Sequence, residues 1–194
     1  MTDAVTVEAA DRAAWRRWLA RHHGRDGGVW LVIHKKGSTT GGLSYEDAVR
    51  EALCFGWIDS TTNKLDDERY RLWMAPRKPR SIWSAVNKRR VEELVAEGRM
   101  REPGAARIEA AKANGSWNAL DPIDALELPD DLLDAFDRHD GSRANWDGFP
   151  PSARKQILYW IYSAKRDETR ARRVEQAASL AARNERANET RPKA

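Results

Sequence analysis

Alternation of side-chain type between Trp57 and Met74 constrains the fold of this chain more than any other feature of its sequence. The second half of the stretch divides into two faces, with Tyr70, Leu72 and Met74 on one and Arg69, Arg71 and Trp73 on the other. A two-residue period is the pattern of a β-strand that is buried on one side. Residues 63–67 read NKLDD, which is turn chemistry. The stretch therefore predicts a β-hairpin.

The N-terminal half supplies helices and one more strand for that hairpin. The run VWLVIHKK, from Val29, is β-branched, aromatic and apolar on both faces, and it predicts a short buried strand. Helices are expected at 7–23, after a cap at Ser44, after a cap at Ser81 or Ser84, and at 103–113. The fold class that these segments predict is α+β, with a small antiparallel or mixed β-sheet packed with helices.

The C-terminal part is expected to be all-helical. The segment GSWNALDPID combines turn residues with a shift to acidic composition, so a boundary is placed near residue 120. Helices are expected from Pro129 to Asp137, after a cap at Ser152 and from Asp167, with GSRANWDGFPP as a loop between the first two. We therefore expect an α+β domain at 1–120, a helical portion at 121–185 and a disordered tail at 186–194.

Basic and acidic residues are segregated along the chain. Lys and Arg number 34 and Asp and Glu number 30, and the resulting net charge of +4 does not by itself indicate a nucleic-acid partner. Residues 77–90 hold six basic side chains and no acid, whereas residues 121–140 hold eight acids and one arginine. The molecule is therefore expected to be polarised.

Composition favours a cytoplasmic protein. The single cysteine, Cys54, excludes an internal disulfide and is expected in the core. The N-terminus lacks a basic leader followed by an apolar segment, and no apolar run approaches the roughly 20 residues of a membrane span. The histidines form no HxxxH or HxxE pair, so neither a metal nor a cofactor is expected.

The stretch from Cys54 to Asn87 holds the candidate binding site. Ligand-binding residues are predicted at Trp57, Asp59, Trp73, Arg77, Lys78, Arg80, Ser81, Trp83, Ser84 and Asn87. The free amides at a helix start carry about half a positive charge, and nearby basic side chains would complete a site for phosphate, sulfate or carboxylate. Two interpretations stay open. The segment is an anion pocket, or it is an ordinary helix cap beside a core tryptophan, with arginines paired to residues 66–68 or 121–140.

Asp59 has two interpretations of its own. A partly buried carboxylate needs a cation, and Arg77 or Arg80 offers a bidentate partner, so a structural ion pair is expected. The alternative is a general acid or base whose pKa is set by that neighbour. No catalytic residue is assigned.

Four motifs follow one another between residues 28 and 180: ALCFGWIDS, PRKPRSIWSAVNKRRVEELVAEGRM, AAKANGSW and ILYWIYSAKRDETRARR. Together they resemble the YdeI/OmpD-associated family, whose members are often labelled bacteriocin-protection proteins. The chain departs from that family at Ser60, where relatives often have glycine. The resemblance implies protection against antimicrobial peptides or an envelope association, without an established reaction. It also implies that the smaller helical portion is the defining domain.

The leading functional hypothesis is a non-enzymatic binding or protection protein. Tryptophan rings would form an apolar wall and Arg77, Lys78 and Arg80 would fix the charge of an anionic or amphipathic small ligand or peptide. A cationic bacteriocin would instead need the acidic stretch 121–140. The first alternative is a nucleic-acid-binding protein, favoured by basic and aromatic interleaving although no known nucleic-acid-binding motif is present. The second is an enzyme that uses Asp59 with a neighbouring arginine.

Overall fold

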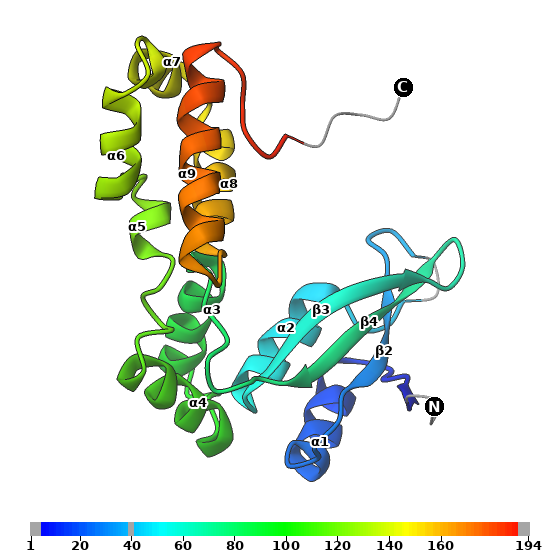
Figure 1. Cartoon of the computed structure of the whole chain (residues 1–194). Coiled ribbons are helices and arrows are strands. Elements are labelled where there is room, and N and C mark those ends of the chain that lie inside the picture. The colour runs from blue at the N-terminus through cyan, green and yellow to red at the C-terminus, as the bar shows by residue number, and fades with distance from the viewer. Residues whose placement is uncertain (1–4, 39–40, 190–194) are drawn as a thin grey trace. The chain divides into compact units, whose positions relative to one another are not determined.

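The computed structural model describes residues 5–38 and 41–189, and the chain divides into two compact units, Met1–Ala119 and Leu120–Ala194 (Figure 1). The first unit contains β1 (Thr6–Val7), α1 (Arg12–His22), β2 (Val29–His34), α2 (Tyr45–Cys54), β3 (Trp57–Lys64), β4 (Arg69–Pro76), α3 (Ala85–Ala96) and α4 (Glu102–Ala113). The second contains α5 (Asp121–Asp124), α6 (Asp130–Asp137), α7 (Ser142–Gly148), α8 (Pro151–Tyr162) and α9 (Asp167–Ala182). The predicted α+β fold class is confirmed.

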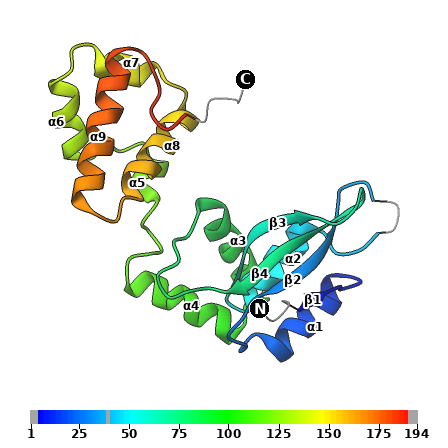
Figure 2. The same cartoon turned by 45° about the vertical axis from the view of Figure 1, so that its right-hand side comes forward.

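The strands form a mixed sheet in the order β1-β2-β4-β3. The central strand β4 is antiparallel to both neighbours, pairing Met74 with Val29 of β2 and Pro76 with Trp57 of β3. The predicted hairpin is therefore confirmed, with an irregularity in register between Asp59 and Thr62. Helices α1 and α2 cover one face of the sheet (Figures 1 and 2).

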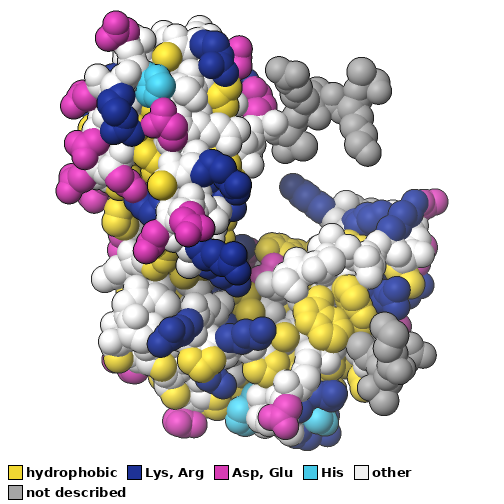
Figure 3. Space-filling model, viewed as in Figure 1, with side chains coloured by type: hydrophobic (Ala, Val, Ile, Leu, Met, Phe, Trp, Pro, Cys, Tyr) yellow, Lys and Arg dark blue, Asp and Glu magenta, His cyan; other side chains and the backbone are white. Residues whose placement is uncertain are grey.

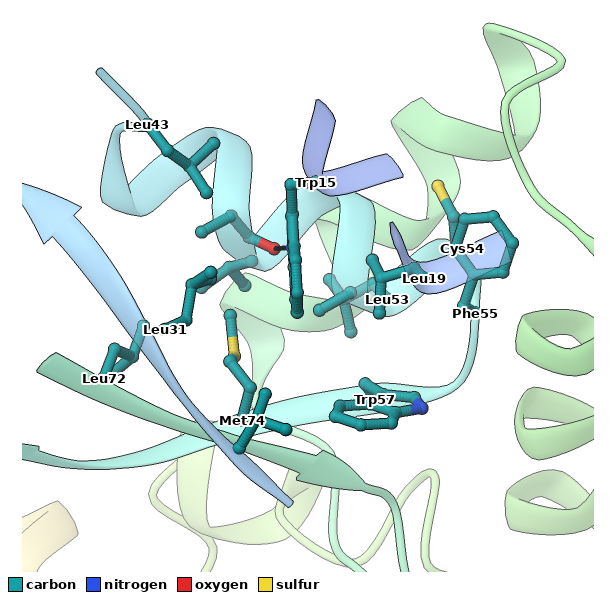
Figure 4. Packing of buried hydrophobic residues seen from close by; sticks show 14 of the residues in the cluster. Trp15, Leu19, Leu31, Leu43, Leu53, Cys54, Phe55, Trp57, Leu72 and Met74 are labelled. Atoms are coloured by element: carbon teal, nitrogen blue, oxygen red, sulfur yellow. Dashed lines mark hydrogen bonds between the residues drawn. The ribbon is translucent and has the colours of Figure 1, made fainter. Parts of the chain in front are cut away.

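A core forms between that sheet face and the two helices because each contributes one apolar stripe. Trp15 of α1 is fully buried, and its indole N–H donates to the carbonyl oxygen of Ala48 in α2 at 3.0 Å. Figure 4 shows Trp15 among side chains from α2 and from the strands, including Leu31 and Met74. Cys54 is buried in this core, as expected.

Two helix starts in this unit show how caps fix boundaries. The helix predicted at 7–23 begins only at Arg12, because the Asp11 side chain accepts from the amide of Ala14 at 2.7 Å and residues Thr6–Val7 pair with β2 instead. Ser44 caps α2 as predicted, accepting from the amide of Asp47 at 3.1 Å.

A buried carboxylate joins α1, α2 and the segment between α3 and α4. Glu51 of α2 is 0% exposed. Arg12 Nε lies 2.5 Å from its Oε1, Arg16 Nη1 lies 2.5 Å from its Oε2, and Arg99 also donates to Oε1. Burial alone would raise the pKa of Glu51, but the hydrogen bonds from the three arginines outweigh it, so the pKa lies below its ordinary value.

Helix α4 starts directly against the end of α2. A Cβ atom placed on Gly104 would lie 2.4 Å from the carbonyl oxygen of Cys54, a distance that real contacts do not reach. The amide of Arg101 donates to that same oxygen at 3.2 Å. The absence of a side chain at 104 therefore lets the first turn of α4 meet the last turn of α2.

The C-terminal unit has its own core, built by α6, α7, α8 and α9 around Phe136, Trp146 and Ile157. The stretch GSRANWDGFPP was predicted as a loop, but it contains α7. Trp146 of this helix is buried, and its packing in the core stabilises the helical segment. The prediction that Ser152 caps the next helix is wrong, since α8 begins at Pro151 and has no side-chain cap. A start at Asp167 for α9 is confirmed.

The tail predicted as disordered, 186–194, falls in part on residues 190–194, which lie outside the described residues. In the described part, Ala187 is buried and the carbonyl oxygen of Asn188 accepts from the Gln156 side chain at 3.2 Å. The four residues after Glu185 are therefore held against the C-terminal unit.

Replacing Glu51 by Gln is expected to destabilise the N-terminal unit by about 3–5 kcal/mol, because the change leaves three guanidinium groups without their shared counter-charge. The folded-state pKa is lowered, so the carboxylate contributes stability above the unfolded-state pKa of about 4.3 and loses it as pH falls through the folded-state pKa. Urea unfolding between pH 7 and pH 3 should show a parent-to-variant difference that is largest near neutrality and shrinks in acid.

The matched control is Glu109→Gln, since Glu109 is exposed and forms an ion pair with the exposed Lys112. That change should alter the free energy of unfolding by less than about 0.5 kcal/mol. A Glu51→Gln effect that stays constant across the pH range would contradict the charge-based account.

Candidate functional site

The predicted site residues extend from β3, through β4 and the linker that follows it (residues 77–84), to the first turn of α3. Four of them are buried residues of the first unit: Trp57, Arg77, Trp83 and Asn87. The indole N–H of Trp57 donates to the carbonyl oxygen of His23 at 3.0 Å, so this ring is fixed within the core. Lys78 and Arg80, on the linker, are exposed. Solvent therefore reaches the side chains of Lys78 and Arg80 but not the rings of Trp57 and Trp83.

Arg77 is a buried cation that no carboxylate of the described residues contacts. It is 2% exposed, and its guanidinium carbon lies 3.6 Å from the centroid of the Trp83 ring. Its Nη1 donates to the carbonyl oxygens of Ser81 and Ile82 and to the Ser81 hydroxyl, each at 3.3 Å. Its Nε and Nη2 are buried and have no hydrogen-bond partner in the part of the chain that the structure describes. Burial lowers the pKa of Arg77 to about 10, although the negative charge of Asp59 acts to raise it.

Asp59 is held by a tyrosine rather than by an arginine. The hydroxyl of Tyr45, the first residue of α2, donates to Asp59 Oδ2 at 2.9 Å. In the part of the chain that the structure describes, no ion pair joins Asp59 to Arg77 or Arg80, so the expected structural pair does not form. Burial and then the Asp59 charge raise the pKa of Tyr45 to about 12. Asp59 therefore acts on Arg77 only through space.

The start of α3 is capped by Ser84 and not by Ser81. The Ser84 hydroxyl accepts from the amide of Asn87 at 3.3 Å, whereas Ser81 contacts Arg77. The Asn87 side chain accepts a hydrogen bond from Arg90 at 2.9 Å, and Arg90 also forms a bidentate ion pair with Glu46. Asn87 thus has a structural partner within its own helix.

Trp73 lies on the other face of the sheet from Trp57. Neighbouring residues of a strand point to opposite faces, and Met74 points into the core. The Trp73 ring instead meets Trp30 edge to face, with centroids 5.1 Å apart, and Arg71 lies 5.4 Å from the Trp30 ring. The structure therefore brings Arg77, Ser81 and Trp83 together and leaves Trp73 elsewhere.

Sequence reasoning missed the cluster at Glu51 and a pocket of about 620 Å³ that lies against α1 and the start of α4. Their charged groups come from segments far apart in the chain, so no spacing rule could have paired them. Within the described residues, no group of three or more His, Cys, Asp and Glu side chains could hold a metal ion. No described helix is both long enough and apolar enough to cross a membrane.

Two protein-family models match the chain. Residues 7–107 match the model described as domain of unknown function DUF8412, and residues 125–184 match the model described as bacteriocin-protection, YdeI or OmpD-associated. The resemblance to the second family is thereby confirmed for the helical portion, and the motifs before residue 107 fall in the first. No curated protein and no solved structure matches the chain.

Replacing Arg77 by Met is expected to change the free energy of unfolding by no more than about 1 kcal/mol. Methionine keeps apolar contact with Trp83, and removal of a buried, incompletely bonded cation offsets the three hydrogen bonds that are lost. Arg77→Ala is the comparison, because its cavity should cost at least about 2 kcal/mol more. Chemical denaturation measures both. A loss above about 3 kcal/mol in Arg77→Met would mean that the guanidinium itself holds the fold.

Proposed function

Because the chain belongs to the DUF8412 family of domains of unknown function and carries a bacteriocin-protection, YdeI or OmpD-associated match in its C-terminal unit, we propose that it is a non-enzymatic binding protein of that second type. Its ligand is an anionic or amphipathic small molecule or peptide. Protection against a bacteriocin, which the family description names, is the proposed outcome of this binding. A cytoplasmic location is part of the proposal, in keeping with a single, buried, unpaired cysteine.

One observation carries the proposal. The buried Arg77 guanidinium has two nitrogens without a hydrogen-bond partner, and it touches no carboxylate among the described residues. A buried charge in that condition is costly unless an anion compensates it. An anion near the linker would gain from this charge while meeting the exposed Lys78 and Arg80.

The neighbouring helix end supports the same ligand class. Helix α3 is 12 residues long, and its first turn carries no acidic side chain. The positive end of its dipole is therefore not neutralised locally, and it adds to the potential of the linker. Trp83 is buried and stacked on Arg77, so it holds the guanidinium group in place beside these charges.

Inorganic phosphate tests this assignment. At constant ionic strength, replacing chloride by phosphate should raise the melting temperature of the parent protein, because a ligand bound only to the folded state stabilises it. Lys78→Ala with Arg80→Ala should lose most of that increase, and Arg77→Met should lose it as well.

The matched control for the linker pair is Arg89→Ala with Lys112→Ala, which also removes one lysine and one arginine, here from exposed positions on α3 and α4. It should keep the phosphate-induced increase of the parent. An equal increase in all four proteins would contradict binding at this segment.

Nucleic acid is a second candidate because of the sheet face that α1 and α2 leave uncovered (Figure 2). Trp30 and Trp73 are partly exposed there with Arg71 beside them, and Figure 3 shows hydrophobic side chains near lysines and arginines over the strands. Aromatic rings on an open sheet stack with the bases of single strands.

If this face binds single strands, Trp73→Leu should weaken the binding of a fluorescent oligothymidine by about 1–3 kcal/mol at low salt. Trp73→Phe keeps a ring and should retain most of the affinity. Fluorescence anisotropy measures both variants, and affinity should fall steeply as salt rises. Absence of binding by the parent protein at low salt would remove this candidate.

A further inference from the structure

A second concave site lies within the N-terminal unit, away from the linker after β4. It is a pocket of about 620 Å³, bounded by α1, by the residue that follows α2 and by the first turn of α4. Its volume is in the range of small-molecule sites. None of its lining residues belongs to the predicted ligand-binding set.

Apolar groups form the floor of this pocket. Phe55 is nearly buried at the edge of the core cluster (Figure 4), and Ala13, Ala20 and Pro103 complete the apolar lining. The Arg16 guanidinium lies 5.5 Å from the Phe55 ring centroid, but its nitrogens are committed to Glu51 and to the carbonyl oxygen of Arg99. Arg16 therefore forms part of the floor and contributes positive charge, but both of its Nη atoms already donate within the protein.

Two other arginines at the pocket have no side-chain partner among residues 5–38 and 41–189. Arg17 of α1 and Arg101 at the start of α4 are exposed, and among the described residues the side chain of neither makes a hydrogen bond or an ion pair. In the described part of this unit, seven of the 15 arginines form ion pairs with carboxylates, as Arg50 does with Glu93 and Glu97. At this pocket, two guanidinium groups that have no such partner among the described residues lie over one apolar floor.

The surroundings keep the pocket positive. Glu102 is the one carboxylate of its lining, and three arginines around Glu51 leave an excess of positive charge behind the floor. His23 adds a polar edge. Its Nδ1 lies 3.2 Å from the carbonyl oxygen of Leu19, which leaves Nε2 outside that contact. Helix α4 also begins here without a side-chain cap, but Glu102 lies in its first turn and offsets the positive end of the helix dipole, so the positive potential comes from the arginines.

We propose that this pocket binds an organic anion that has a flat apolar body and one carboxylate, sulfonate or phosphate group. The body lies on Phe55 and Pro103, and the anionic group is held between Arg17 and Arg101. The site lies within residues 7–107, so it is a property of the DUF8412 part of the chain and does not rest on the anion site at Arg77.

Calorimetric titration of the full chain with 2-naphthoate tests the proposal, with 2-naphthol as the uncharged body and acetate as the anion without a body. The parent protein should bind 2-naphthoate at least about tenfold more tightly than either fragment, because charged hydrogen bonds and apolar burial must both contribute. Binding no tighter than that of 2-naphthol or acetate overturns the proposal.

Variants locate the binding. Arg17→Ala with Arg101→Ala should weaken 2-naphthoate binding at least about tenfold, and Arg17→Gln with Arg101→Gln should do the same with side-chain length nearly kept. Arg21→Ala with Lys112→Ala is the matched control, because it removes the same charge from exposed positions on the same two helices outside the pocket. Affinity should stay within about twofold of the parent in this control. Equal losses in control and test pairs, or no loss in either, overturn the proposal.

One further pair separates the two sites. Lys78→Ala with Arg80→Ala should leave 2-naphthoate binding unchanged, even though the same pair is expected to lose the phosphate effect. If it abolishes 2-naphthoate binding while the Arg17 and Arg101 pair does not, the naphthoate site is at the linker and the pocket proposal fails.

Discussion

The carboxylate of Glu51 is the constraint on which the N-terminal unit depends. It is fully buried in α2 and accepts hydrogen bonds from Arg12 and Arg16 of α1 and from Arg99 beyond α3. A lone buried charge would be intolerable, and three cations packed together would repel, so neither side of the cluster is stable alone. The cluster therefore fixes α1 and the entry to α4 relative to α2, and α2 in turn lies on the sheet.

Charge is handled in three different ways within this one unit. At Glu51, excess cations surround a single anion. At Arg77, a cation is buried against a tryptophan with part of its hydrogen-bonding capacity unused. At Arg17 and Arg101, cations that have no hydrogen-bond or ion-pair partner among the described residues lie over an apolar floor. The first arrangement maintains the fold, while the other two leave positive charge for a molecule from outside.

Local sequence rules predicted what depends on neighbouring residues. The hairpin followed from alternation and from NKLDD, and the cap at Ser44 followed from a hydroxyl ahead of apolar periodicity. The same rule left Ser81 and Ser84 open as caps of α3, and the structure selects Ser84. These rules did not predict contacts between residues that are far apart in the sequence. Asp59 was expected to pair with an arginine, but Tyr45, which folding brings opposite it, takes that place. Helix α7 was not predicted because its residues favour loops. The helix is stabilised by packing of Trp146 against residues far away in the sequence, which local patterns do not show.

The close approach at Gly104 bears on the pocket between α1 and α4. Pro103 and Arg101 lie at the start of α4, and at Gly104 no Cβ atom fits against the Cys54 carbonyl oxygen. One wall of the pocket is thus placed by a contact between main chains. Any larger residue at 104 would require the start of α4 or the end of α2 to shift, and the positions of Pro103 and Arg101 would shift with it.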